Sequence, residues 1–162
     1  MVDEVCLNDT LLAGVKEVFE TMIFMDVRGS DEQDQHPKGN TLLGSITFTG
    51  DMEGCLGICC SVSGAKAIAQ NMLGLTEAED LSEEEITDAI GEVTNMVMGS
   101  VKSRIQDVVG CLNVSIPTVV RGRSLDNSLG DHGNPTHKTL MKLNVADEYT
   151  AELSLCYRQS QK

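Results

Sequence analysis

The stretch DAIGEVTNMVMG, Asp88–Gly99, lies in the middle of a long segment with helical periodicity, from about residue 82 to residue 109. At about 100° per residue, the apolar positions of this segment fall on one stripe, which consists of Ile86, Ile90, Val93, Val97, Val101 and Val108. A line almost opposite this stripe, called the polar line below, carries Asp88, Glu92, Asn95 and Gly99. The pattern predicts a helix that buries the stripe and exposes the polar line, with Glu92 and Asn95 one turn apart.

Two residues of the polar line are unusual for an ordinary solvated helix surface. Asn is a mediocre helix former, and Gly inside a helix costs about 1 kcal/mol relative to Ala. A better helix former could stand at Asn95 and at Gly99 if helix stability were the only requirement. A missing side chain at Gly99 would also let a partner approach the helix closely. The residues alone leave two interpretations open, a plain solvated face and a docking face.

Local signals place the ends of this helix and of the other predicted elements. Ser82 and Glu85 form a capping-box pattern at its start, and Gly110 is expected to end it. Pro117 indicates that its strand lies at a sheet edge or contains a bulge. The other predictions are a helix at 10–25 capped by Asp9 or Thr10, strands at 42–49, 55–62 and 114–121, a helix at 63–73 ended by Gly74, a hairpin of 141–145 with 151–157, and loops at 28–40 and 126–136.

The predicted strands mostly alternate, so that each has one apolar face. This alternation favours a largely antiparallel sheet with helices packed on one face, a two-layer α/β (α+β) sandwich. With 162 residues, the chain is long enough for one domain with a real core, and we expect a single domain over residues 1–162.

The charge of the chain excludes some partners. A net charge of −13 argues against binding to nucleic acid and to anionic membrane surfaces. Acidic residues gather between Glu77 and Glu92, without a Lys or Arg among them. They either suit the positive end of the helix dipole or steer a partner with a basic rim. No apolar run is long enough for a membrane span and no signal-peptide pattern is present, so a cytoplasmic protein is expected.

The cysteines and histidines do not have the spacing of a metal site. The six cysteines are scattered without a C-x-x-C pair, and Cys59 and Cys60 must point to opposite faces of their strand. We expect reduced, half-buried thiols. The spacing of His36, His132 and His137 supports no zinc site, and no metal or cofactor of the chain's own is expected. An unrelated small-molecule enzyme lacks support, because the sequence has no Gly-rich phosphate loop and no nucleophile–base pair.

The pattern D-A-x-x-E-x-x-N-x-x-x-G, formed by Asp88, Ala89, Glu92, Asn95 and Gly99, resembles the signature of the CheC/CheX/FliY family of chemotaxis phosphatases. A second stretch, PTVVRGRSL at Pro117–Leu125, is similar to the strand that follows this helix in CheX proteins. The order of elements matches over nearly the whole chain. CheC proteins carry a second E-x-x-N on their first helix, whereas here Glu20 is followed three positions later by Ile23. The resemblance is therefore to CheX rather than to CheC.

This resemblance implies dephosphorylation of a phosphorylated response regulator of the CheY type, in chemotaxis or two-component signalling. In that family the amide at the position of Asn95 orients the attacking water, and the carboxylate at the position of Glu92 binds a lysine of the regulator. The divalent metal, Mg²⁺, belongs to the regulator. The resemblance also implies a homodimer whose sheets join. We expect Arg121 and Arg123 to have a structural or interface role rather than a catalytic one. The alternative is a non-catalytic dimeric module that docks on a regulator or another signalling protein without turnover.

Overall fold

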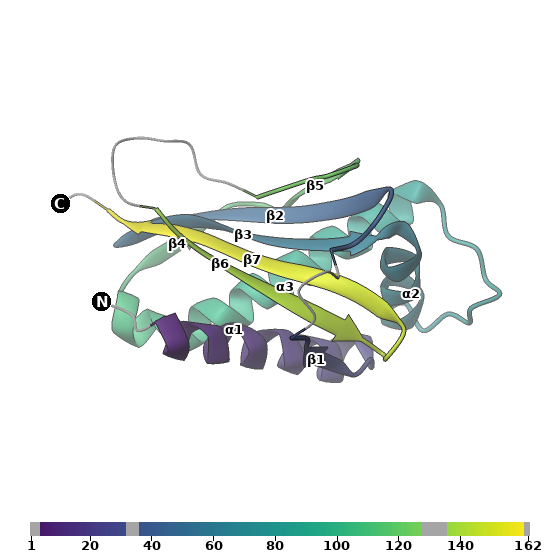
Figure 1. Ribbon diagram of the computed structural model, residues 1–162, viewed down its shortest axis with the longest axis horizontal. Coiled ribbons are helices and arrows are strands. Elements are labelled where there is room, and N and C mark those ends of the chain that lie inside the picture. Colours follow the sequence, from purple (N-terminus) through teal and green to yellow (C-terminus); the bar gives the residue numbers. More distant parts are fainter. Residues whose placement is uncertain (1–3, 32–35, 128–135, 161–162) are drawn as a thin grey trace.

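The computed structural model describes residues 4–31, 36–127 and 136–160 (Figure 1). The helical elements are α1 (Glu4–Val18), the short π-helix η1 (Phe19–Ile23) that continues it, α2 (Val62–Met72) and α3 (Glu83–Val109). The strands are β1 (Val27–Gly29), β2 (Thr41–Gly50), β3 (Met52–Ser61), β4 (Leu112–Val114), β5 (Thr118–Gly122), β6 (His137–Val145) and β7 (Tyr149–Gln159).

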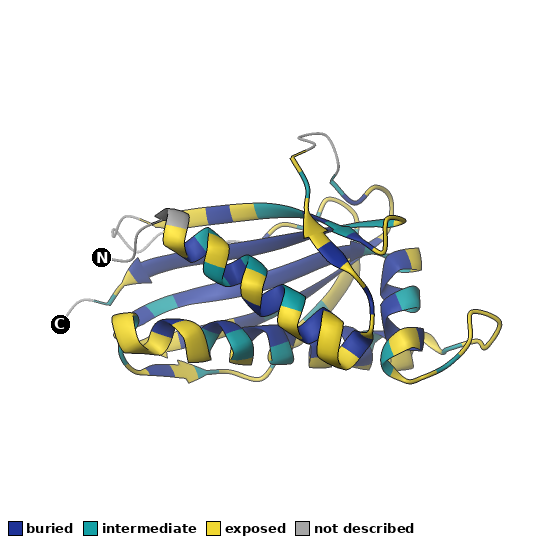
Figure 2. Ribbon diagram, turned by 90° about the horizontal axis from the view of Figure 1, so that it is seen from below, coloured by how far each residue is buried: buried dark blue, intermediate teal, exposed yellow. Residues whose placement is uncertain are grey.

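The strands form one sheet in which every pairing is antiparallel. Their order is β1–β6–β7–β3–β2, and both β4 and β5 pair with the remaining side of β2. The helices lie together against one face of this sheet, as Figures 1 and 2 show from two directions. The two-layer fold predicted from strand alternation is therefore confirmed.

Helix α3 begins as its capping pattern predicts. Ser82 Oγ accepts a hydrogen bond from the Glu85 amide at 3.1 Å, and the Glu85 carboxylate accepts one from the Ser82 amide at 2.7 Å. The helix ends before Gly110, whose φ of 93° suits glycine. The apolar stripe is buried from Ile86 to Val101. The prediction was wrong for Val108, which is 70% exposed, because burial on α3 ends one turn earlier at Ile105.

The position of α3 is set by close contact with its neighbours. Gly44 of β2 lies under the helix, where a Cβ atom would come within 2.1 Å of Oγ1 of the buried Thr94. On the side of α1, the Glu17 carboxylate accepts hydrogen bonds from Ser100 Oγ at 2.5 Å and from Arg104 at 2.6 Å. The sheet and α1 together hold α3 in a defined place.

The N-terminal elements depart from the sequence prediction. Helix α1 is already formed at Glu4, so neither Asp9 nor Thr10 caps it, and the buried Leu7 adds a contact with the core before the predicted start. The helix changes to the wider η1 at Phe19 and ends before Phe24, which has a φ of 60°. The segment predicted as the loop 28–40 includes most of β1, whose three residues pair with β6. So short a strand has no periodicity from which it could be recognised.

Pro117 was predicted to mark a sheet edge or a bulge, and it marks both; the bulge divides the predicted strand 114–121 into β4 and β5. Phe48 pairs with Val114, but Ser45 pairs with Thr118. Three residues, 115–117, therefore lie opposite two residues of β2, which leaves one extra residue in the edge strand. The single alternation predicted from 114 to 121 is wrong, because the extra residue reverses which side chains face the helices.

The central strands β3 and β7 are buried on both faces rather than on one. As a result Cys55, Cys59, Cys60 and Cys156 are buried rather than half-buried, while Cys6 and Cys111 are exposed; all six are free thiols. The buried Asn127 covers part of the face opposite the helices, where it accepts hydrogen bonds from the thiols of Cys55 (3.1 Å) and Cys156 (3.3 Å). Most of the loop predicted at 126–136 lies outside the described residues, as does His132.

Candidate functional site

The polar line of α3 lies on the solvent face of the helix layer. Asp88, Glu92, Asn95 and Gly99 are all exposed. A Cβ atom at Gly99 would have no neighbouring atom within 4 Å, so this position is open. Within the described part of the chain, the side chains of Glu92 and Asn95 form no hydrogen bond or ion pair. An amide and a carboxylate one turn apart are thus available to a partner.

The backbone that carries these two side chains is rigid. Val93 and Thr94 are buried between them, and the Thr94 hydroxyl donates a hydrogen bond to the Ile90 carbonyl at 2.7 Å. The helix continues in both directions with buried residues one turn away. A group presented in this way loses little backbone entropy when a partner binds.

The edge strand flanks the polar line on the side of Asn95. A Cβ atom at Gly91 would lie 3.5 Å from Val119 Cγ2 and 3.9 Å from Pro117 Cγ. On the helix, Asn95 is rotated by about 40° from Gly91, whereas Glu92 is rotated by about 100°. Asn95 is therefore the nearer of the two to the bulge between β4 and β5.

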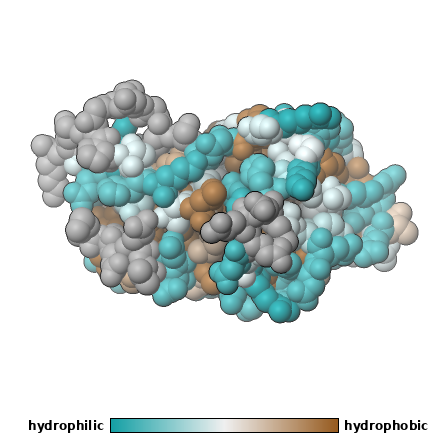
Figure 3. Space-filling view, viewed as in Figure 1, coloured by the Kyte–Doolittle hydropathy of each residue, from teal (hydrophilic) through white to brown (hydrophobic). Residues whose placement is uncertain are grey.

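The surroundings of the polar line are acidic. Glu83, Glu84 and Glu85 are exposed in the first turn of α3, before Asp88 and Glu92. Figure 3 shows the surface from the side of Figure 1, where the strands lie in front of much of α3, and this side is mainly hydrophilic with separate apolar patches. The acidic side chains of the first turn interact favourably with the positive end of the helix dipole. Together with Asp88 and Glu92, they give this face of α3 a negative potential.

The two arginines of the second motif both make structural contacts. Arg121 of β5 pairs with Glu83 at 3.1 Å, which ties the edge strand to the start of α3. Arg123 donates to the Asn40 side chain at 3.3 Å. Neither arginine lies on the polar line. A surface ion pair such as Arg121–Glu83 contributes only about 0–1 kcal/mol, so its main effect is on orientation.

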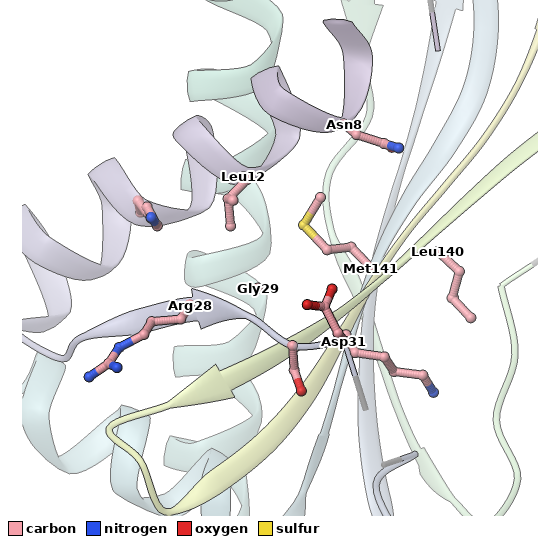
Figure 4. A pocket seen from close by; sticks show the side chains of 10 residues that line it. Asn8, Leu12, Arg28, Gly29, Asp31, Leu140 and Met141 are labelled. Carbon is pink, nitrogen blue, oxygen red and sulfur yellow. The ribbon is translucent and has the colours of Figure 1, made fainter. Parts of the chain in front are cut away.

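A cavity of about 620 Å³ lies elsewhere, between α1, β1 and β6 (Figure 4). Asn8 and Leu12 border it on α1, Arg28 on β1, and Leu140 and Met141 on β6. No residue of α3 lines it, so the cavity and the polar line are separate features. Among the described residues no three His, Cys, Asp or Glu side chains gather to hold a metal ion.

The chemistry available on the polar line is limited to an amide and carboxylates. An amide can accept a hydrogen bond from water and donate one to an oxyanion, while a carboxylate can pair with a lysine. This arrangement can position a water on a partner's reactive group. None of the helices in the described ranges combines the length and apolar character that a membrane crossing requires.

Comparisons with known proteins agree with the two sequence motifs. A family model described as "Chemotaxis phosphatase CheX" matches residues 42–135. The CheY-P phosphatase CheX of Thermotoga maritima is 30% identical over 118 residues, which cover 68% of this chain and 74% of the relative.

Solved structures share the fold. The chemotaxis protein CheX from Vibrio vulnificus has a TM-score of 0.72 at 26% identity, over 94% of this chain and 96% of that one. A chain of the CheX–CheY–BeF₃–Mg²⁺ complex from Borrelia burgdorferi has a TM-score of 0.71, over 98% of this chain and 100% of that one; at 16% identity it supports the fold alone. The family match and the Thermotoga maritima relative show that this chain belongs to the CheX family of chemotaxis phosphatases.

Proposed function

We propose that this chain dephosphorylates the phospho-aspartate of a CheY-type response regulator, with Asn95 orienting the attacking water and Glu92 binding a lysine of the regulator. The observation that carries the proposal is the exposed pair itself. Both side chains lie on one rigid face, without a partner among the described residues and in the spacing of the family motif. Support comes from the Thermotoga maritima relative, which is named a CheY-P phosphatase.

The reaction is the hydrolysis of an acyl phosphate. Water attacks phosphorus in line with the bond to the aspartate carboxylate, this bond breaks, and inorganic phosphate and the free aspartate are released. Phosphoryl transfer needs little covalent help, so orienting the water is a sufficient role for an amide. In this proposal Asn95 accepts a hydrogen bond from the water, and Mg²⁺ belongs to the regulator.

Glu92 has a different role from Asn95. A carboxylate one turn away from the amide can form a charge-assisted hydrogen bond with a lysine at the rim of the regulator's active site. This bond sets the register of the helix on the regulator, so that the amide meets the phosphoryl group. The acidic first turn of α3 adds long-range attraction to a basic rim.

The proposal includes the assembly of this chain into a homodimer and its location in the cytoplasm. Within the described residues β5 pairs only with β2, so its outer side offers unpaired backbone groups to a second copy. Sedimentation should find a dimer at micromolar concentration, and a monomer well above that concentration would contradict the assembly.

The alternative function is a dimeric binding module that docks on a regulator without turnover. The same exposed pair favours it, because an amide and a carboxylate are sufficient for docking. The two functions differ in one measurement, the release of phosphate from a phosphorylated regulator with and without this protein.

The test of the mechanism is single-turnover phosphate release by Asn95→Ala. Removing one oriented hydrogen-bonding group typically lowers an enzymatic rate by about 100-fold or more. We expect such a loss, while binding to a regulator loaded with beryllofluoride and Mg²⁺ is retained. Glu92→Ala should weaken binding and turnover together. Gln106→Ala, which removes an exposed amide further along α3, is the matched control and should change neither.

Near wild-type turnover by Asn95→Ala would contradict the mechanism. If the wild-type protein binds the loaded regulator but never releases phosphate, the binding module becomes the correct function.

A further inference from the structure

The bulge between β4 and β5 is the most unusual feature near the polar line. The pairing of Phe48 with Val114 and of Ser45 with Thr118 leaves one extra residue in the segment 115–117. Bulges concentrate at sheet edges and beside active sites, where they redirect a side chain. The middle residue of this segment is Ile116.

Ile116 is 85% exposed, more than any other large apolar residue in the described ranges. A single exposed apolar side chain on a mobile loop would need no explanation. Here the backbone on both sides is held. Ser115 donates its amide to the Thr47 carbonyl at 2.9 Å, its hydroxyl accepts from the Thr47 amide at 3.0 Å, and Pro117 has a fixed φ. An ordered backbone thus keeps Ile116 in solvent.

The position of Ile116 along α3 follows from the packing of Gly91. The edge strand and α3 run in opposite directions, because Arg121 meets Glu83 while Pro117 and Val119 lie against Gly91. Gly91 is therefore level with residue 118. The extra residue of the bulge shortens the advance along the strand, so that the two steps from 118 back to 116 cover about 3.3–6.6 Å. This length corresponds to about two to four residues of helix. Ile116 is thus level with the turn that carries Asn95.

We propose that Ile116 is an apolar contact for the phosphorylated regulator at the site of Asn95. The inference rests on the proposed function. For the Asn95 amide to reach a phosphoryl group inside another protein, the loops around that group must close over this turn of α3. The bulge borders the turn on the side of Asn95, so these loops meet Ile116. The regulator is expected to present an apolar side chain there, beside its phosphorylation site.

A second copy of this chain is the competing occupant, and the strand pairing disfavours it. A dimer joined along the sheet would use the backbone of β5, Thr118–Gly122. Ile116 lies outside that range, in a bulge where the ladder is interrupted.

The experiment measures two properties of Ile116→Ser and Ile116→Ala. One is the affinity for a CheY-type receiver domain loaded with beryllofluoride and Mg²⁺, by fluorescence anisotropy. The other is the rate of phosphate release at saturating phosphorylated receiver. We expect at least a fivefold loss of affinity, larger for Ser than for Ala, and an unchanged rate at saturation, because Asn95 is intact. Leu140→Ser, at an exposed leucine of β6 across the sheet, is the matched control and should leave both values unchanged.

Three outcomes would overturn the inference. Unchanged affinity in both variants would show that the regulator does not touch Ile116. Dissociation of a dimer with unchanged affinity for the receiver would assign Ile116 to the second copy. If the wild-type protein neither binds the loaded receiver nor releases phosphate, the proposed function itself fails, and this inference fails with it.

Discussion

Replacing Gly99 with Ala should stabilise the protein and weaken its function. Gly99 lies inside α3, and a Cβ atom there meets nothing within 4 Å. The substitution therefore introduces no steric strain, and only helix propensity changes. That change favours Ala by about 1 kcal/mol. For a chain of this size, the corresponding increase in Tm is about 2–4 °C, which a thermal melt followed by circular dichroism resolves.

The same methyl group should interfere with docking. If a partner packs closely on the polar line, an added methyl group overfills the contact, and overpacking typically costs about 1–3 kcal/mol. Since 1.4 kcal/mol corresponds to about a tenfold change in Kd, affinity for a regulator loaded with beryllofluoride and Mg²⁺ should fall by about 5-fold to 140-fold. Isothermal titration calorimetry measures this directly.

Gly91→Ala is the matched control on the same helix. Its Cβ atom would make ordinary van der Waals contacts with Val119 and Pro117, and the position is buried, off the polar line. It should gain helix propensity without losing affinity. The reasoning about Gly99 is refuted if Gly99→Ala binds the regulator as tightly as the wild type. A lower Tm for Gly99→Ala than for the wild type would separately refute the expectation that Ala stabilises the helix at this position.

Three further predictions concern stability and thiol chemistry. Gly44→Ala should lower the free energy of unfolding by about 1–3 kcal/mol in a urea titration, because its Cβ atom would come within 2.1 Å of Thr94 Oγ1; unchanged stability would contradict the packing. At neutral pH, iodoacetamide should modify only Cys6 and Cys111 in the native protein, because burial raises the pKa of the other four thiols. After unfolding it should modify all six cysteines. Two cysteines that stay unmodified after unfolding under reducing conditions would contradict the prediction that all six are free thiols. Hydrogen bonds from serine and arginine lower the pKa of Glu17 in the folded state, so its stabilising contribution is present above its ordinary pKa of 4.5 and is lost as the pH falls through the lowered value. Glu17→Gln should therefore have a lower free energy of unfolding than the wild type at pH 7. This difference between the two proteins should narrow on acidification, and a constant difference would contradict the assignment.

Much of α3 was predictable because its signals are local. The reciprocal hydrogen bonds of Ser82 and Glu85 depend on residues three positions apart, and the separation of the stripe from the polar line depends only on the helical period. For the same reason the exposure of Glu92 and Asn95 could be predicted without knowledge of the sheet. Their proposed roles came from the motif that resembles CheX proteins.

Features that depend on long-range contacts could not be read from the sequence. Burial of the thiols in β3 and β7 follows from their central places in the sheet, which strand alternation does not reveal. Periodicity placed Val108 in the core, but the position where burial on a helix ends depends on the elements packed against it.

The sequence by itself determined the helix, its cap, its buried and exposed faces, and the edge or bulge at Pro117, because these depend on residues close together in the chain. Only the tertiary structure showed that the bulge lies level with Asn95 and exposes Ile116. The register of an edge strand against β2, and its distance from a helix on the same sheet, result from pairings between residues 73 to 81 positions apart. No local pattern records such pairings, so the surroundings of the candidate site became visible only in the folded chain.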